Sequence, residues 1–183
     1  PCFWVLLNFD QLNKGLTTEL LSLTLKTISF GLITSLIAVI FSLILSLATR
    51  KNKNFFLKLI TFPAGIGYAI PGSVLAISLI TISSSRFTFI SVCLLIWGYV
   101  IRFLTISKGS IDSALERISP TLDEAANGLG SNWLEIIRRI HLPLLKGPIF
   151  VGSLLVFVDT IKELPISFIY RPLDFDTLSV RIY

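Results

Sequence analysis

Two long stretches without a charged side chain most strongly limit what this chain can fold into. Between Lys26 and Arg50 lie 23 uncharged residues, and between Lys58 and Arg86 lie 27. About 20 apolar residues are enough to cross the hydrocarbon core of a bilayer as a helix. The composition agrees, because the mean hydropathy is +0.81 and only 15% of residues are charged, against about 25% in an average soluble domain. The sequence therefore predicts an all-α, polytopic membrane protein.

These stretches and the apolar runs after them predict four membrane spans, at about 26–49, 66–84, 87–106 and 148–170. Pro and Gly residues interrupt the second span, so we expect a kinked or broken start and a regular helix after Pro71. Arg102, near the end of the third span, is expected to snorkel toward the lipid headgroups. Residues 1–20 are expected to lie outside the membrane on its extracytoplasmic side, or along its surface.

Basic residues are concentrated in two of the loops between these spans. Loop 50–58 contains Arg50, Lys51, Lys53 and Lys58, and loop 107–147 contains Lys108, Arg117, Arg138, Arg139 and Lys146. Cytoplasmic loops of membrane proteins carry such an excess, so both loops are predicted to be cytoplasmic and the turn at 83–88 to face outside. The net charge of +5 then belongs to these flanks and requires no nucleic-acid partner.

The polar loop 107–147 contains the pattern of two short amphipathic helices. Thr121 and Glu124 fit a capping box that opens the first helix, and Gly128 and Gly130 are expected to end it. Its apolar face carries Leu122, Ala125, Ala126 and Leu129, at positions i, i+3, i+4 and i+7. This face is small and flat, so the backbone of a partner could approach it closely.

Asn132 and Glu135 repeat the capping pattern for a second helix, which Leu142-Pro143 is expected to end. One side of this helix is apolar, with Trp133, Ile136, Ile137 and Ile140. Periodicity alone fits two arrangements, a loop that packs against its own bundle and a docking element that seats in a cleft of a soluble partner.

The spacing of residues in this loop resembles the cytoplasmic EAA signature of permeases in the ABC import family, and every fixed position is matched. The resemblance implies a transmembrane bundle of the type I ABC importer permease kind over residues 21–183, with a cytoplasmic coupling-helix loop. It assigns docking of an ATPase to Glu124, Ala125, Ala126, Gly130, Ile140, Leu142 and Pro143. Glu124 and Gly130 occupy the coupling core of the motif.

The resemblance also implies partners and a location. A cytoplasmic ABC ATPase dimer would bind ATP and Mg, and a periplasmic substrate-binding protein would deliver the solute. This chain would be the second half of the permease, and the other permease half would complete the pore in the cell inner membrane. This chain would be a transport subunit without catalytic residues or a cofactor of its own, and it contains no Gly-x-x-x-x-Gly-Lys phosphate loop. Because it starts at Pro1 and family members continue beyond Tyr183, we expect a piece of a longer permease that lacks C-terminal spans.

Three further runs resemble ferric iron permeases, namely Ile70–Ala76, Val158–Pro165 and Arg171–Leu178. Ferric iron uptake is therefore the expected function, and thiamine, polyamine, phosphonate or another small solute is the alternative. A membrane-embedded enzyme would need paired catalytic groups, whereas this chain has one histidine and no His-Glu-x-x-His. A structural membrane subunit is the remaining alternative.

Charged residues within the fourth span are costly in a membrane and therefore indicate a role. Asp159, Lys162 and Glu163 have i, i+3, i+4 spacing, which would place them on one helical face where Lys162 neutralises Asp159 and leaves Glu163 as a negative site. We predict that this face lines the translocation path, because carboxylate oxygens suit a hard cation. A structural ion pair, or a span that ends early with its charges among the headgroups, is the alternative. No metal site is assigned, and His141 is expected to be a solvated loop residue or to contact a carbonyl group.

Overall fold

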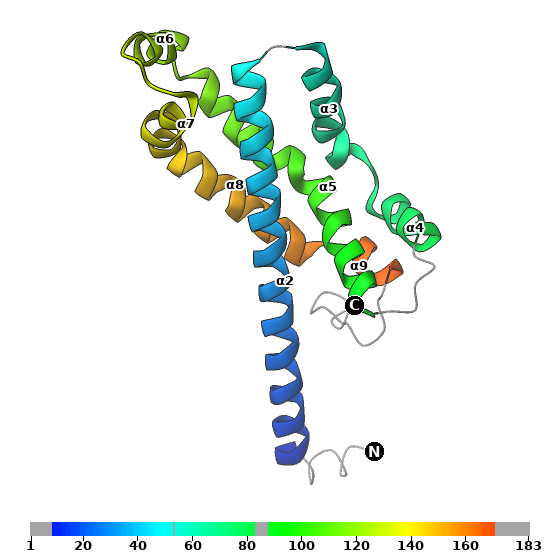
Figure 1. Ribbon diagram of the computed structural model, residues 1–183. Coiled ribbons are helices and arrows are strands. Elements are labelled where there is room, and N and C mark those ends of the chain that lie inside the picture. Colours follow the sequence, from blue (N-terminus) through cyan, green and yellow to red (C-terminus); the bar gives the residue numbers. More distant parts are fainter. Residues whose placement is uncertain (1–8, 53, 83–87, 171–183) are drawn as a thin grey trace.

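The computed structural model describes residues 9–52, 54–82 and 88–170, and every regular element in these ranges is helical (Figure 1). This confirms the predicted all-α class. Three long helices pack against one another as the frame, namely α2 (Phe9–Lys51), α5 (Thr88–Glu116) and α8 (Leu142–Lys162). Shorter elements surround them: α3 (Phe55–Ile66), the 3₁₀ turn η1 (Gly67–Ala69), α4 (Gly72–Ile82), α6 (Pro120–Gly128), α7 (Trp133–Ile136), the π-helical turn η2 (Ile137–His141) and α9 (Pro165–Ile169).

Three stretches of the described chain are long and apolar enough to cross a membrane, Leu21–Lys51, Ile90–Glu116 and Trp133–Lys162. The first predicted span, 26–49, lies within α2. This helix already begins at Phe9, so residues 9–20 continue the same helix and do not form a separate segment, and the first turns extend past the other helices (Figure 1). Residues 1–8 and 83–87 lie outside the described ranges, as does the run Arg171–Leu178.

The predicted span 66–84 is not one helix. After Pro71 the chain forms only α4, whose 11 residues extend about 16 Å, which is short of the roughly 30 Å of hydrocarbon. The predicted break and the helix after Pro71 are confirmed. Helix α5 partly satisfies the backbone at the break, because the Thr105 hydroxyl donates to the carbonyl oxygen of Ala64 at 2.7 Å and accepts from the N–H of Tyr68 at 3.4 Å.

Helices α5 and α8 both extend into the loop predicted at 107–147. Helix α5 continues to Glu116 because Ile111 and Leu115, beyond the predicted span end at 106, are buried against Leu47 and Leu145. Helix α8 starts at Leu142 and ends at Lys162, so the predicted span 148–170 is broken after Lys162 and its last residues form α9.

Small and hydroxyl-bearing side chains let the long helices approach closely. The hydroxyl groups of Ser42 on α2 and Ser107 on α5 are hydrogen-bonded to each other, and Ser42 also donates to the carbonyl oxygen of Leu104 at 3.3 Å. Gly152 of α8 lies against the backbone of Ser107. Such residues are typical of helix contacts in membranes, where apolar burial alone gives little driving force between helices.

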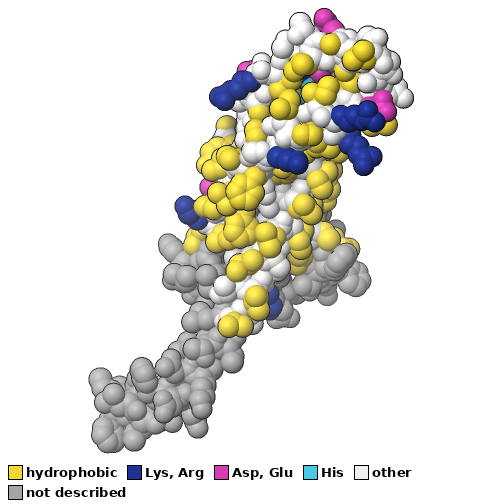
Figure 2. All heavy atoms as spheres, turned by 90° about the vertical axis from the view of Figure 1, so that its left-hand side faces the viewer, with side chains coloured by type: hydrophobic (Ala, Val, Ile, Leu, Met, Phe, Trp, Pro, Cys, Tyr) yellow, Lys and Arg dark blue, Asp and Glu magenta, His cyan; other side chains and the backbone are white. Residues whose placement is uncertain are grey.

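One end of the molecule differs in composition from its middle. The end of α2, the end of α5, and α6 and α7 all gather there (Figure 1). On the face shown in Figure 2, hydrophobic side chains cover the middle of the molecule, and most of the Lys and Arg side chains lie nearer the end that carries α6 and α7. The basic residues of the two loops predicted to be cytoplasmic therefore lie toward one end of the fold.

Candidate functional site

The predicted docking residues lie in the segment 119–143, which we call the docking loop. Its first helix, α6, begins at Pro120, and its N-cap is Ser119, whose hydroxyl accepts from the N–H of Thr121 at 3.3 Å. The predicted capping box at Thr121 and Glu124 is therefore wrong by two residues. Pro120 explains the shift, because proline fits the first position of a helix, where its missing N–H leaves no hydrogen bond unmade.

Gly130 ends α6 as predicted, and the hydrogen bonds around it form a Schellman motif. The N–H of Gly130 donates to the carbonyl oxygen of Asn127 at 2.9 Å, and the N–H of Ser131 donates to that of Ala126 at 3.0 Å. Gly130 has φ of +83°, a conformation that favours glycine. Gly130, the glycine of the EAA signature, therefore sets the sharp turn between α6 and α7.

The second helix starts as predicted but does not end where predicted. The Glu135 carboxylate accepts from the N–H of Asn132 at 3.1 Å, which is the predicted capping interaction. At its far end, the Leu142 N–H donates to the carbonyl oxygen of Ile137, five residues back, so α7 continues through a π-helical turn into α8. Pro143 therefore does not stop the helix. It lies in the first turn of α8, where a proline is tolerated.

The docking loop presents an exposed apolar surface at the end of the molecule. Three leucines that project from it, Leu122, Leu129 and Leu134, are 46%, 88% and 76% exposed. No side chain of α6 is buried. Of the predicted docking residues, the structure exposes Glu124, Ala125, Gly130, Leu142 and Pro143 and half-buries Ala126 and Ile140.

A cluster of polar side chains joins this loop to the helical frame, and we call Arg50, Asp123 and His141 the anchor cluster. The Nε of Arg50, at the end of α2, donates to Oδ2 of Asp123 at 2.8 Å. The other carboxylate oxygen, Oδ1, lies 3.1 Å from Nε2 of His141, whose side chain is fully buried. The expectation that His141 is solvated is therefore wrong, because the folded loop encloses it between Asp123 and Trp133.

Arg50 also binds the end of α5. Its Nη1 donates to the carbonyl oxygen of Leu115 at 2.6 Å, and its Nη2 donates to that of Ile118 at 2.9 Å. Carbonyl groups at a helix C-terminus lack partners within the helix and carry partial negative charge, so a guanidinium group there is favourable. One side chain thus connects α2, α5 and α6.

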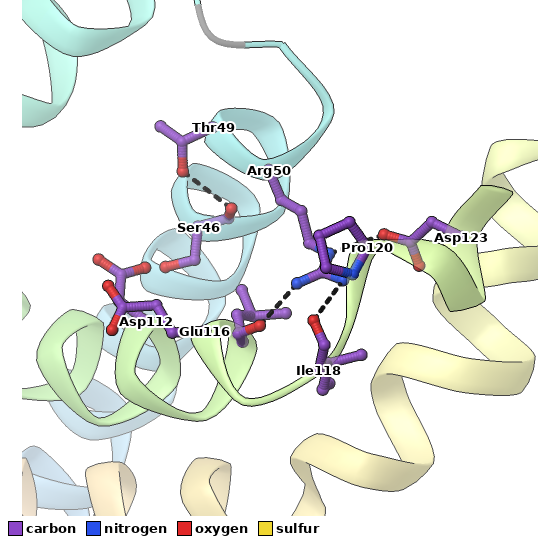
Figure 3. A pocket seen from close by; sticks show the side chains of 9 residues that line it. Ser46, Thr49, Arg50, Asp112, Glu116, Ile118, Pro120 and Asp123 are labelled. Atoms are coloured by element: carbon purple, nitrogen blue, oxygen red, sulfur yellow. Dashed lines mark hydrogen bonds and ion pairs between the residues drawn. The ribbon is translucent and has the colours of Figure 1, made fainter.

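The anchor cluster borders an open groove of about 530 Å³ between the ends of α2 and α5 and the start of α6. Figure 3 shows Arg50 reaching from α2 toward Asp123, while Asp112 and Glu116 line the α5 side. Asp112 is paired with Lys108 one turn earlier on α5, so this pair stays within one helix.

Sequence reasoning missed the anchor cluster. Arg50 was counted only as a basic flank of a loop, and Asp123 was not considered although it precedes the EAA triplet. Two residues could have indicated it, the lone histidine in the I-x-L-P segment and the acidic residue in the first turn of α6. No local sequence pattern, however, shows that these two side chains are in contact.

Of the three charged residues predicted to share a face of the fourth span, Glu163 does not lie on the helix with Asp159 and Lys162. Helix α8 ends at Lys162, and Glu163 follows in extended conformation with φ of −71° and ψ of 112°. Glu163 is not left without a cation, because its Oε1 lies 3.4 Å from Nη1 of Arg102 on α5. Among the described residues no ion pair joins Asp159 to Lys162, and Lys162 is exposed whereas Asp159 is half-buried.

Arg102 therefore turns into the protein instead of snorkelling. Its guanidinium carbon lies 5.9 Å from the ring centre of Tyr68 and 5.8 Å from that of Phe103, and its side chain is 15% exposed. A paired, ring-covered arginine is less costly inside a membrane protein than one facing lipid. In the described part of the chain, no group of three or more His, Cys, Asp or Glu side chains is arranged to hold a metal ion.

Comparison with known proteins adds two findings. Residues 38–169 match the family described as "Binding-protein-dependent transport system inner membrane component". The chain is also similar to the Fe(3+)-transport system permease protein FbpB 2 of Haemophilus influenzae, with 23% identity over 183 residues that cover 99% of this chain. The chain spans about a third of that relative, 36% of its length.

Proposed function

Because this chain belongs to the family of binding-protein-dependent transport system inner membrane components, we propose that it forms part of the membrane pore of an ABC importer, with the docking loop as the contact for a separate ATPase. The family is a transport component and not an enzyme. In this proposal the ATPase dimer binds ATP and Mg on the cytoplasmic side, a substrate-binding protein supplies the solute from outside, and a second permease half completes the pore.

One observation carries the docking role. The exposed leucines of the docking loop stand on helices that are capped at Ser119, turned at Gly130 and held to the frame through Asp123. A flexible loop would lose much of its binding energy to ordering, whereas a preformed apolar surface loses little. Small helices with exposed apolar faces are suited to grooves on a soluble partner. The docking loop therefore has the form that a force-transmitting contact requires.

The charge at the docking-loop end of the molecule supports a proposed orientation of the chain in the membrane. The basic residues of the docking loop, with Arg50 and Lys51, lie where cytoplasmic loops of membrane proteins carry excess positive charge. We place this end in the cytoplasm and the start of α2 toward the outer face. An ATPase that uses cytoplasmic ATP would then meet the docking loop directly.

Ferric iron is the solute that we propose. This proposal is supported by the Fe(3+) transport named for the Haemophilus influenzae relative and by the carboxylates near the end of α8, because oxygen ligands suit a hard cation. Asp159, Lys162 and Glu163 are the proposed path residues. Since Arg102 compensates the charge of Glu163, Asp159 is the carboxylate better able to attract a passing cation. Thiamine, polyamine, phosphonate or another small solute is the alternative.

The test is uptake of radioactive ferric iron into vesicles that contain the full-length permease, its ATPase and the substrate-binding protein. Glu124→Lys places a cation on the exposed face of the docking loop, so we expect it to weaken ATPase assembly and abolish uptake. Asp159→Asn removes a carboxylate charge from α8 without breaking the ion pair between Glu163 and Arg102, so it should lower uptake while ATPase assembly stays intact.

Two results would separate the parts of this proposal. Absence of iron uptake by the wild-type complex, with ATPase assembly intact, would refute iron as the solute and leave the permease assignment standing. Normal assembly and uptake with Glu124→Lys would refute the docking role.

A further inference from the structure

Helix α6 has little contact of its own with the helical frame. None of its side chains is buried, and the neighbour that it packs against most is α7. Yet α6 carries Leu122 and Glu124 of the exposed docking surface. A force applied to this surface therefore needs a route into the frame other than broad apolar packing.

Asp123 supplies that route in two directions. Through Oδ2 it binds Arg50, which in turn holds carbonyl oxygens at the end of α5. Through Oδ1 it meets His141, immediately before α8. The three long helices of the frame are thus each reached from one carboxylate group. The exposed fractions of the side chains are 13% for Arg50, 15% for Asp123 and 0% for His141, so bulk water screens these contacts only weakly.

We propose that Arg50, Asp123 and His141 are positioning residues that make the docking loop move as one body with the ends of α2, α5 and α8. The proposal rests on the proposed docking of an ATPase, and it adds which contacts carry the resulting movement. Without the anchor cluster, an ATPase could still bind the exposed leucines, but α6 would shift against the frame and the pore would not follow.

The groove beside the anchor cluster provides a matched control. Asp112 lines the same groove as Asp123 (Figure 3). It also forms an ion pair, but its partner Lys108 lies on the same helix. Asp112→Asn therefore removes a carboxylate charge from the groove without disconnecting any two elements. Any effect seen with Asp123→Ala and not with Asp112→Asn follows from the link between elements.

The experiment measures the position of α6 relative to the frame in the full-length permease assembled with its ATPase. Spin labels are attached at Asn127→Cys on α6 and Ile40→Cys on α2, both at exposed positions, after replacement of the native cysteines. Distances between the labels are measured by double electron–electron resonance, without nucleotide and with ATP trapped by vanadate. ATPase co-purification and iron uptake per ATP hydrolysed are recorded for the same variants.

We expect one narrow distance in the wild type that is the same in both nucleotide states, and the same result for Asp112→Asn. Asp123→Ala should broaden the distance distribution and make it dependent on nucleotide, while the ATPase still co-purifies. Uptake per ATP should then fall by about fivefold or more, the scale at which coupling between distant sites is usually measured.

Milder variants cover the case in which Asp123→Ala does not fold. His141→Ala breaks only the α8 branch and should broaden the distribution partially. His141→Gln, whose amide group can donate to the Asp123 carboxylate, should restore it. A narrow, nucleotide-independent distance in Asp123→Ala and His141→Ala would overturn the proposal, as would a nucleotide-dependent distance in the wild type. A wild-type permease that binds no ATPase would refute the proposed function, and the distances without nucleotide would still test the anchor cluster.

Discussion

Arg102 and Glu163, on α5 and just after α8, form an ion pair with 3.4 Å between Nη1 and Oε1, and the pair lies directly against Gly72 at the start of α4. A side chain at Gly72 would collide with both charged groups. The pair therefore joins α4, α5 and the segment between α8 and α9 at one point. It also accounts for two charges that would be costly if they stood alone within the bundle.

Removing one member of this pair should cost more than removing both. Arg102→Met leaves the Glu163 carboxylate buried without a cation, so we expect a loss of about 3–5 kcal/mol in stability. The double variant Arg102→Met/Glu163→Gln should recover most of that loss. Thermal unfolding of the detergent-solubilised full-length permease measures both, and equal or additive losses would contradict the inferred pairing.

The turn after α6 should depend on glycine. Gly130 has φ of +83°, where a residue with a Cβ is strained by about 1–2 kcal/mol. Gly130→Ala should therefore weaken ATPase co-purification, and Gly130→Asn should weaken it less, because asparagine tolerates this backbone conformation better. Gly109→Ala, at an open position within α5, is the matched control and should have no effect on co-purification.

The exposed leucines should contribute to partner binding and not to stability. Leu129 is 88% exposed, so Leu129→Ser should leave the unfolding temperature unchanged. If the ATPase buries this side chain, its loss should weaken binding by about 1.5–3 kcal/mol, roughly tenfold to a hundredfold in Kd. Leu144→Ser, at a 55% exposed position on α8, serves as the control for general surface polarity. Unchanged affinity with Leu129→Ser would remove this leucine from the docking surface.

Labelling from each side of the membrane tests the orientation. Leu134 is 76% exposed at the end predicted to be cytoplasmic, so Leu134→Cys should react with an impermeant thiol reagent in inverted vesicles and be protected in intact cells. Replacement of Cys2 and Cys93 removes the background. Ser84→Cys, in the turn predicted to face outside, should show the opposite pattern. Labelling of both positions from the same side would contradict the predicted topology.

Features that depend on a few neighbouring residues could be predicted from the sequence. The cap formed by Asn132 and Glu135 and the break before Pro71 each follow from local backbone chemistry, and both are present. The start of α6 was misplaced because two capping residues, Ser119 and Thr121, stand two positions apart, and only the proline between them decides.

Features that depend on distant residues could not be predicted. Arg50 and Asp123 are 73 residues apart, and no local pattern identifies which charges meet across a bundle. The same applies to Arg102. Its position near a predicted span end led to the prediction that it reaches the lipid headgroups, whereas in the folded chain it pairs with Glu163. For charged residues in membrane helices, the partner is decided by tertiary packing, which hydropathy does not record.

The π-helical turn has one more consequence for how the docking loop and α8 are oriented. Ile136 and His141 are both fully enclosed although they are five residues apart. In a regular α-helix, five residues advance by about 500°, which would turn these side chains about 140° away from each other. The turn therefore resets the phase of the helix by roughly one residue. Deleting a single residue there would rotate the docking loop around the helix axis relative to α8, so the number of residues in this turn sets the direction in which the exposed leucines of the loop point.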